Sequence, residues 1–353
     1  MPNPSNFRWQ NIPRPIVALA PMAGVTDASY RQLIKKLAPE VVVYSEFLST
    51  DALAYSGKKT MAMMHFDPKL ERPFIVQIFG KKPEHFLEAA KIVEQMGADG
   101  IDINMGCPAA KVVSSCHGSA LIKTPELAAE LVHATVKSVS IPVSVKTRLG
   151  WNTAETLIPF CTRLVEAGAQ ALAVHGRRFL DKFTGSADWA PIYALKDALP
   201  TITIIGNGDI CCAQDALDRI GNLDGVMIGR GTIGNPWLCR DVCDAFSSIP
   251  PLVSILGTDR AGRPLPPEEK GERVQEKHKL IPTVERLSFA EKIPFILEHC
   301  ALAVKTKGER KGMLEMRTHL AHYVKGMHGA KELRARLVRV ETLEDVRQIL
   351  AAY

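Results

Sequence analysis

The sequence predicts an α/β fold: a (β/α)8 or TIM barrel, followed by a small all-α domain. Eight short β-type runs recur along the first part of the chain, and most are continuously apolar, as parallel strands buried on both faces should be. Segments with helical periodicity separate these runs, and only helical patterns follow residue 287. The expected strands are Ile16–Met22, Val41–Phe47, Phe74–Gly80, Gly100–Gly106, Val143–Leu149, Ala171–Arg177, Thr203–Asp209 and Gly225–Gly231.

The segments between these runs carry helix signals. Thr124 predicts an N-cap, with Pro125 at the first helical position and Glu126 in the first turn. Gly97 predicts the end of a helix whose buried face holds Phe86, Ala89, Ala90, Val93 and Met96. A doubly wound sheet is the alternative fold. It would more usually carry a Gly-rich dinucleotide turn after its first strand, and the segment over 20–24 is not one.

Composition divides the chain into three parts. Residues 1–246 are expected to form the barrel, the Pro- and Gly-rich stretch over 247–287 a linker or insertion, and residues 288–353 a helical domain. The chain has 353 residues, 46% of them hydrophobic, which is enough to bury a sizeable core. The longest apolar stretch, Ile16–Val25, is too short to cross a membrane. We therefore expect a cytoplasmic protein with no membrane partner.

Positive charge is concentrated near the C-terminus. Residues 305–339 hold ten Lys or Arg and three Asp or Glu, a net +7, whereas the whole chain carries +6. Such a stripe indicates a polyanion partner, although a solvated helix face would show the same pattern. The eight cysteines include no Cys-x-x-Cys pair, so no metal site is expected.

Polar side chains stand at the carboxyl ends of most expected strands, where the chemistry of a barrel lies. Because parallel strands end on one side of a barrel, these side chains should share one pocket. The glycines after the last two strands, with Arg230, match a barrel phosphate site; tight turns that need glycine are the alternative. Lys146 could also serve as a Schiff-base nucleophile.

Six motifs in this order resemble the tRNA-dihydrouridine synthase family over residues 15 to 240. The C-terminal Arg317-x-His319-x-x-x-Tyr323 and the Gly118-Ser119-Ala120 segment are most similar to the DusB-type bacterial branch. The six motifs are Ala20-Pro21-Met22-Ala23-Gly24-Val25-Thr26-Asp27, Asn104-Met105-Gly106-Cys107-Pro108, Lys146-Thr147-Arg148-Leu149-Gly150-Trp151, His175-Gly176-Arg177, Asn207-Gly208-Asp209 and Gly229-Arg230.

The resemblance implies an FMN cofactor, NADPH as electron donor and uridine in tRNA, of the D-loop, as substrate. Hydride would pass from flavin N5 to uracil C6, and Cys107 would give a proton to C5, since a cysteine thiol is ordinarily protonated at neutral pH. The implied cofactor contacts are Pro21, Met22 and Ala23 along the ring, Gln77 and Lys146 at its polar edge, His175 beside the ribityl chain, and Asn207, Gly208, Asp209, Gly229 and Arg230 at the phosphate.

The resemblance also implies where tRNA would bind. Asn104, Arg148 and Arg177 would contact the substrate in the barrel mouth, and a target base would have to be extruded from folded tRNA to reach it. The basic C-terminal helices would hold the RNA backbone. Candidate cations there are Lys305, Arg310, Lys311 and Arg317. We expect a monomer.

Several alternatives stay open. A flavin barrel acting on a free small molecule would share the cofactor residues but would not explain the +7 segment. Another RNA, such as ribosomal RNA, or a non-catalytic role in RNA binding would explain that segment. The loop after Cys107 has only Lys111 as a basic residue, whereas the family usually carries several polar or basic residues there. His319 and His322, three apart on a helix, indicate structural or RNA-contacting histidines rather than metal ligands.

Overall fold

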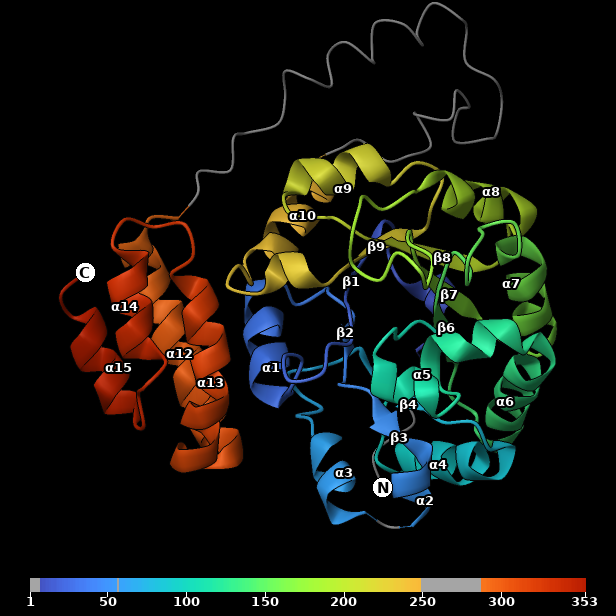
Figure 1. Ribbon diagram of the computed structural model, residues 1–353, viewed down its shortest axis with the longest axis horizontal. Coiled ribbons are helices and arrows are strands. Elements are labelled where there is room, and N and C mark those ends of the chain that lie inside the picture. Colours follow the sequence, from blue (N-terminus) through green and yellow to red (C-terminus); the bar gives the residue numbers. More distant parts are fainter. Residues whose placement is uncertain (1–6, 56, 249–286) are drawn as a thin grey trace, which may run out of the picture.

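The computed structural model describes residues 7–55, 57–248 and 287–353, and within them a barrel with a helical domain beside it (Figure 1). No described helix is long and apolar enough to cross a membrane. The strands are β1 (Ile16–Leu19), β2 (Val43–Tyr44), β3 (Leu48–Ser49), β4 (Phe74–Phe79), β5 (Gly100–Asn104), β6 (Val143–Arg148), β7 (Ala171–His175), β8 (Thr203–Asn207) and β9 (Gly225–Ile228).

All the strands pair in parallel, in the order β1-β9-β8-β7-β6-β5-β4-β2, and β3 pairs with β4. The ring closes between β1 and the residue before β2. Leu19 N donates to Val42 O at 2.9 Å, and Val42 N donates to Val17 O at 3.0 Å. The expected (β/α)8 barrel is confirmed.

The second expected strand, Val41–Phe47, is not one strand, and this prediction needs correction. Only Val43–Tyr44 of this run forms a strand, β2, and β3 (Leu48–Ser49) begins after the run ends. The Ser45 hydroxyl accepts from Gln77 N at 3.0 Å and donates to Glu46 O at 2.6 Å. A side chain thus takes a position in the ladder that a backbone carbonyl would occupy. The chain then rejoins β4 with β3 opposite Ile78 and Phe79.

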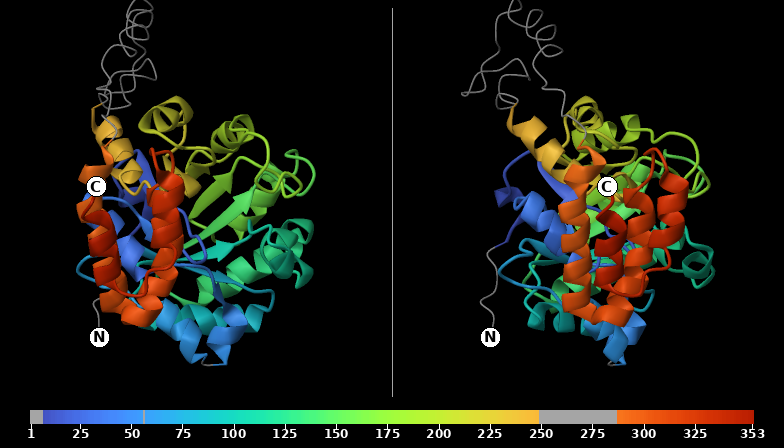
Figure 2. Two further views of the ribbon diagram at one scale, coloured as in Figure 1. Left: turned by 60° about the vertical axis from the view of Figure 1, so that its left-hand side comes forward. Right: turned by 90° about the vertical axis from the view of Figure 1, so that its left-hand side faces the viewer.

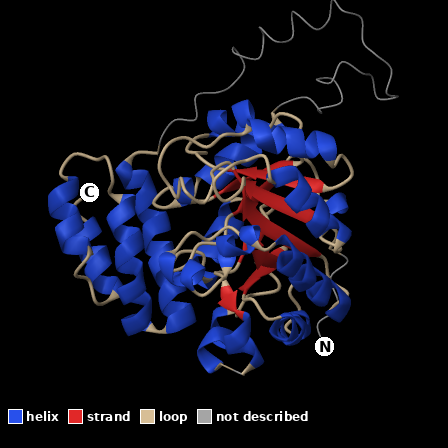
Figure 3. Cartoon of the chain, turned by 45° about the vertical axis from the view of Figure 1, so that its right-hand side comes forward, coloured by secondary structure: helices blue, strands red, loops and turns tan. Residues whose placement is uncertain are grey.

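Helices surround the strands (Figure 3). The helix α4 buries the expected face, and Thr124 stands at the N-cap of α6, although its side chain makes no capping hydrogen bond. The barrel helices are α1 (Ala28–Leu37), α2 (Thr50–Ala54), α3 (Lys58–Met63), α4 (Pro83–Gln95), α5 (Ala110–Ser114), α6 (Pro125–Ser138), α7 (Leu157–Glu166), α8 (Ala190–Ala198), α9 (Ala213–Arg219) and α10 (Leu238–Ser247). Short 3-10 turns are η1 (Trp9–Asn11), η2 (Gly118–Lys123) and η3 (Arg230–Thr232).

The C-terminal helices form their own hydrophobic core and lie along one side of the barrel (Figure 2). Trp237 from the barrel is part of that core, and Lys307 forms an ion pair with Asp27, the N-cap of α1. The expected linker over 247–287 lies almost entirely outside the described residues. The helices of this domain are α12 (Phe289–Lys307), α13 (Glu309–Tyr323), α14 (Ala330–Leu337) and α15 (Leu343–Leu350).

A buried cluster of rings joins the two parts. Tyr30 of α1 lies against His299 of α12 and His319 of α13, with ring centroids 5.3 and 5.2 Å away. His299 Nδ1 is 3.1 Å from the hydroxyl of Tyr323. Burial lowers the pKa of His319 to about 4 and holds the pKa of His299 well below its usual range. The His319 and Tyr323 of the C-terminal motif therefore belong to the contact between barrel and helices.

Candidate active site

The register of the sheet brings the polar strand ends together. Asn104 of β5 is opposite Lys146 of β6, and Arg148 of β6 is opposite His175 of β7. His175 is in turn opposite Asn207 of β8. Four neighbouring strands therefore present hydrogen-bonding side chains at one edge of the barrel, as the sequence predicted.

The Cys107 turn is held from three sides. Asn104 Oδ1 accepts from Cys107 N at 3.0 Å, and Arg148 Nε donates to Gly106 O at 2.7 Å. The hydroxyl of Ser119 donates to Cys107 O at 2.8 Å. Gly118 has a φ of +60°, and a Cβ there would lie 3.0 Å from Cys107 O. The thiol of Cys107, which is partly exposed, thus stands on a fixed backbone at the mouth.

Two cations face this turn. Burial and the neighbouring Arg148 charge lower the pKa of Lys146 to about 8, while Asp102 and Cys107 act to raise it. Burial lowers the pKa of Arg148 to about 10, and here too Cys107 opposes the shift. Lys146 Nζ donates to Asn207 Oδ1 at 3.1 Å. Both cations therefore interact electrostatically with the Cys107 side chain.

Arg148 also has a structural role. Its Nη1 donates to Lys182 O at 2.7 Å and to Arg178 O at 3.1 Å, which ties the β7–α8 loop to β6. Its Nη2 has no hydrogen-bond partner among the described residues. The guanidinium lies 5.4 Å from the ring of Phe183, a half-exposed side chain that also faces Arg230. Arg148 is only 2% exposed, so Nη2 is a largely buried donor without a partner in the described part of the chain.

The turns after β8 and β9 form an anion cradle. Within the described part of the chain, the backbone N–H groups of Gly208, Asp209 and Gly229 donate no hydrogen bond, which leaves them free for an anion. Gly208 has a φ of +133°, and a Cβ there would meet Ala187 Cβ at 2.6 Å. Arg230, 55% exposed, adds a positive charge 3.8 Å from Asp209. Unpaired amides beside an exposed guanidinium suit a phosphate group.

Arg177 does not have the role expected for it. Its five N–H groups all have partners inside the chain: Thr184 O, Gly185 O, His175 Nε2 and both carboxylate oxygens of Asp209. Its side chain is only 3% exposed. Arg177 has no donor left for RNA and instead positions the Asp209 turn.

The contacts with Arg177 also affect the protonation states of Asp209 and His175. Burial acts to raise the pKa of Asp209, but hydrogen bonds from Arg177 and Ala187 N lower it overall, so the carboxylate is anionic and faces Arg177. Only the backbone of Asp209 is available to a phosphate. Burial and the surrounding cations lower the pKa of His175 to about 2. The neutral imidazole accepts from Arg177 at Nε2 and therefore carries its proton on Nδ1.

Gln77 lies deeper than expected. Its side chain has no exposed surface, and it bridges Asn104 and Asp102 rather than standing at the mouth. In this structure it acts through Asn104 and not at the polar edge of a bound ring. Pro21 and Met22, by contrast, are partly exposed, and Ala23 is exposed.

Two acidic residues near the mouth were not expected from the sequence. Glu46, after β2, accepts from Gly24 N at 2.5 Å and so supports the turn after β1. Asp102, inside β5, is completely buried. An acidic residue within the apolar run Gly100–Asn104 was the signal that could have identified the second.

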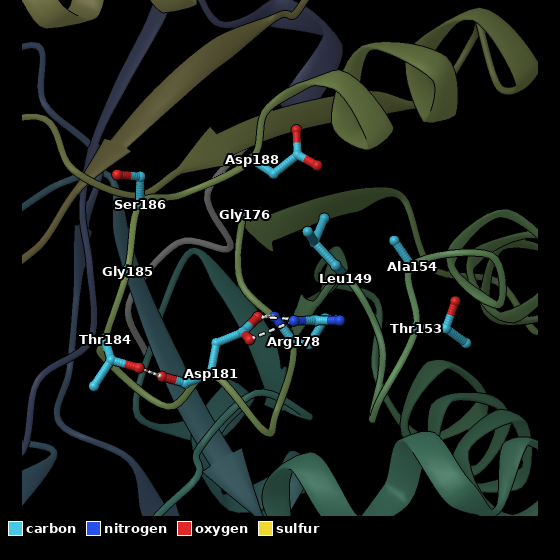
Figure 4. Close-up of a pocket in the computed structure, with 10 residues that line it drawn as sticks. All are labelled: Leu149, Thr153, Ala154, Gly176, Arg178, Asp181, Thr184, Gly185, Ser186 and Asp188. Atoms are coloured by element: carbon cyan, nitrogen blue, oxygen red, sulfur yellow. Dashed lines mark hydrogen bonds and ion pairs between the residues drawn. The ribbon is translucent and has the colours of Figure 1, made fainter.

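A polar pocket of about 340 Å³ lies next to the mouth, between the β6–α7 and β7–α8 loops (Figure 4). Arg178 and Asp181 form an ion pair of 2.8 Å at its edge. None of the side chains expected at the cofactor lines it. Its lining residues are Leu149, Thr153, Ala154, Gly176, Arg178, Asp181, Thr184, Gly185, Ser186 and Asp188.

Similarity to known proteins identifies the family of this chain. The family model for dihydrouridine synthase matches residues 18–253. A probable tRNA-dihydrouridine synthase 1 from Synechocystis is 35% identical over 95% of this chain and 85% of its own length. The chain belongs to the dihydrouridine synthase family. The tRNA-dihydrouridine synthase B of Pseudomonas aeruginosa is also 35% identical, over 94% of this chain and 92% of its own.

Membership of the family makes the protein an oxidoreductase, not an aldolase-like enzyme with a Schiff-base Lys146. The solved structure of 2-naphthoyl-CoA reductase with 2-naphthoyl-CoA has a TM-score of 0.52 and 13% identity, over 65% of this chain and 50% of that one. At this identity the likeness concerns the barrel fold alone.

The basic residues of the C-terminal helices differ in exposure and in whether their side chains are bonded within the chain. Lys305 and Arg310 are exposed and form no ion pair with any described residue, and Lys311 lies 4.0 Å from Glu315. Arg317 differs from the expectation: its Nε donates to Val340 O at 2.9 Å, which joins α13 to the segment after α14. Among the four expected cations, Lys305 and Arg310 are the most available to a polyanion.

Among the described residues no group of three or more metal-ligating side chains is present.

Proposed function

We propose that the protein reduces the C5=C6 bond of uridine in tRNA to 5,6-dihydrouridine, with FMN held in the barrel mouth and NADPH as electron donor. One observation carries the proposal: the cradle of free amides at Gly208 and Gly229 opens at the same barrel end as Lys146 and Cys107. Known relatives named as tRNA-dihydrouridine synthases support the choice of substrate.

The residues present fit FMN. The amides of Gly208, Asp209 and Gly229, with Arg230, would bind its phosphate, and neutral His175 would donate from Nδ1 to the ribityl chain. Lys146 would face the ring system, with Pro21, Met22 and Ala23 along it. Asn207, which the resemblance puts at the phosphate, accepts from Lys146 and donates to Met227 O, so it would instead position Lys146. When bound, FMN supplies hydride from N5 to uracil C6. A charged Lys146 near the ring favours its anionic reduced form.

Cys107 would complete the reduction. Hydride addition at C6 leaves C5 in need of a proton, and the Cys107 thiol would give it, becoming a thiolate. Lys146 and Arg148, which interact electrostatically with Cys107, would lie beside the sulfur during this step. Water would then return a proton to sulfur. Uridine gains two electrons and two hydrogens, and NADPH supplies both electrons in the next half-cycle.

The helical domain would hold the tRNA near the mouth. A Cβ at Gly234, in the turn after β9, would lie 2.5 Å from His322 O, so the end of α13 touches a loop that follows the last barrel strand. Lys305 and Arg310 would contact phosphates, and Asn104 and the Nη2 of Arg148 would meet the extruded base. The DusB-type resemblance favours a uridine of the D-loop.

The test uses the purified protein with NADPH, without oxygen. Its substrates are bulk tRNA that lacks dihydrouridine, ribosomal RNA and free uridine, each followed by mass spectrometry of the nucleosides. We expect bound flavin and dihydrouridine in tRNA alone. Reduction of free uridine at an equal rate would support the small-molecule reductase, and product in ribosomal RNA alone would reject tRNA as substrate.

A further inference from the structure

A buried chain of hydrogen bonds runs from the barrel interior to the Cys107 turn. Asp102 Oδ1 accepts from the Ser144 hydroxyl at 2.7 Å, and its Oδ2 accepts from Gln77 Nε2 at 2.7 Å. Gln77 Oε1 accepts from Asn104 Nδ2 at 2.8 Å. Asn104 Oδ1 then accepts from Cys107 N at 3.0 Å. The chain thus joins β4, β5 and β6 to the proposed proton donor.

The two ends of this chain determine the direction of both amide groups. A carboxylate can only accept, so Gln77 must turn its amino group toward Asp102. The backbone N–H groups of Gly106 and Cys107 can only donate, so Asn104 must turn its oxygen toward them. Gln77 and Asn104 then meet through the one remaining donor and acceptor. Reversing the Gln77 amide would break two hydrogen bonds, and reversing the Asn104 amide would break three.

Asp102 is also the acidic group that acts on Lys146. Asp102 is buried opposite Ser144 on β6, two residues before Lys146. Burial raises the pKa of Asp102 to about 6, and burial lowers the pKa of Lys146 to about 8. Between these values Asp102 is anionic while Lys146 is cationic. The Tyr44 hydroxyl, also buried here, stays protonated because burial raises its pKa.

We infer that Asp102 is a positioning residue with two effects: it orients Gln77 and Asn104 beneath Cys107, and it keeps Lys146 charged beside the cofactor. The inference rests on the proposed function. It gives a role to a carboxylate that touches neither substrate nor cofactor. Burying a carboxylate costs free energy because the charge is removed from water, and an apolar side chain of similar size would avoid that cost. A functional role explains why a carboxylate is present here.

The experiment measures the reduction potential of the bound flavin against pH in the holoenzyme. Deprotonation of Lys146 should change the slope of the plot of reduction potential against pH near pH 8; this change of slope is called the break. The Lys146→Met variant should lack the break, which would assign the break to Lys146. Asp102→Asn keeps the shape and can still accept from Gln77, but it removes the negative charge. We expect its break at a pH lower by about one unit. Ser144→Ala keeps the carboxylate and should leave the break in place.

A second variant tests the orienting effect and does not depend on the folding of Asp102→Asn. Gln77→Leu leaves Asp102 and Lys146 in place but cuts the link to Asn104. We expect a dihydrouridine-forming step about tenfold slower, because the Cys107 turn loses its support. An unshifted break in Asp102→Asn, an equal shift in Ser144→Ala, or a wild-type rate in Gln77→Leu would overturn the inference.

These outcomes separate the inference from the proposed function. A wild-type protein without flavin, or one that forms no dihydrouridine, would overturn both. A wild-type protein that forms dihydrouridine, together with an unmoved break in a flavin-loaded Asp102→Asn protein, would overturn the role of Asp102 alone.

Discussion

The side-chain oxygen of Asn104 lies 3.0 Å from the backbone nitrogen of Cys107, and this bond connects a strand end to the thiol proposed as proton donor. Arg148 holds the preceding carbonyl, that of Gly106, at 2.7 Å. The backbone around the thiol is therefore held by residues of two neighbouring strands. Loss of either hold should affect the proton-transfer step before it affects cofactor binding.

Replacing Cys107 by Ala should keep the flavin and lower turnover on tRNA by about a hundredfold or more, because a positioned acid contributes that much. The matched control is Cys116→Ala, since Cys116 is exposed in the same loop. Turnover and flavin content are measured on the same preparations. A fully active Cys107→Ala protein would remove the thiol from the mechanism.

Replacing Asn104 by Leu keeps the volume but leaves Gly106 N and Cys107 N without their acceptor. We expect a single-turnover rate lower by about ten- to a hundredfold, because misplaced reacting groups cost that much. Flavin affinity should change little. A rate loss that matches an equal loss of flavin affinity would show that Asn104 acts through the cofactor and not through Cys107.

Arg177 and Asp209 should act as one unit in cofactor binding, because both carboxylate oxygens bond the guanidinium at 2.8 Å. Arg177→Met and Asp209→Asn should each weaken FMN binding by about tenfold, since the turn beneath the phosphate loses its support. The double variant should be no weaker than the poorer single one. Fluorescence titration with FMN measures all four proteins, and additive losses would contradict the coupling.

Changing both Lys305 and Arg310 to Ala should weaken tRNA binding and reduce its salt dependence. Two lost phosphate contacts should lower the slope of log affinity against log salt by about one to two. Lys137→Ala, an exposed lysine on α6, serves as control. Point changes are preferred to removal of the domain, which would expose Trp237. An unchanged slope would place the RNA elsewhere.

Mild acid should destabilise the protein through the ring cluster. The pKa of His319 is about 4 in the folded protein, below its value in the unfolded chain, so the unfolded state takes up the proton first. Stability is then fully present above about pH 6.5 and is lost as the pH falls toward 4. The loss by about pH 5 is of the order of 2 kcal/mol for this group. Thermal unfolding of wild type and His319→Gln checks it: the variant should show a shallower pH dependence, and an unchanged slope would contradict the assignment.

The barrel and the strand ends could be predicted from sequence because both depend on local patterns. Apolar runs mark strands buried on two faces, and parallel strands must end on one side. Asn104, Lys146 and Asn207 were therefore expected together, and the register brings them together. The interruption between β2 and β3 was not foreseen, and there the Ser45 hydroxyl accepts from Gln77 N, a contact that the local sequence does not show.

Pairings between distant residues account for the remaining differences. Arg177 and Asp209 were both expected to face ligands, yet each satisfies the other, and nothing in the local sequence shows it. In the sequence Arg317 cannot be distinguished from the free cations of its segment, but in the structure its Nε donates to Val340 O. Asp102 has its partners on two other strands, Gln77 and Ser144, so its environment exists only in the folded barrel.

The most direct test of the account is a single turnover. The bound flavin is reduced without oxygen, excess reductant is removed, and tRNA lacking dihydrouridine is added. Flavin reoxidation is followed by absorbance, and dihydrouridine is counted by mass spectrometry. The account predicts one dihydrouridine for each flavin reoxidised, with a far slower reaction in Cys107→Ala. Reoxidation without dihydrouridine, or an equal rate in Cys107→Ala, would contradict it.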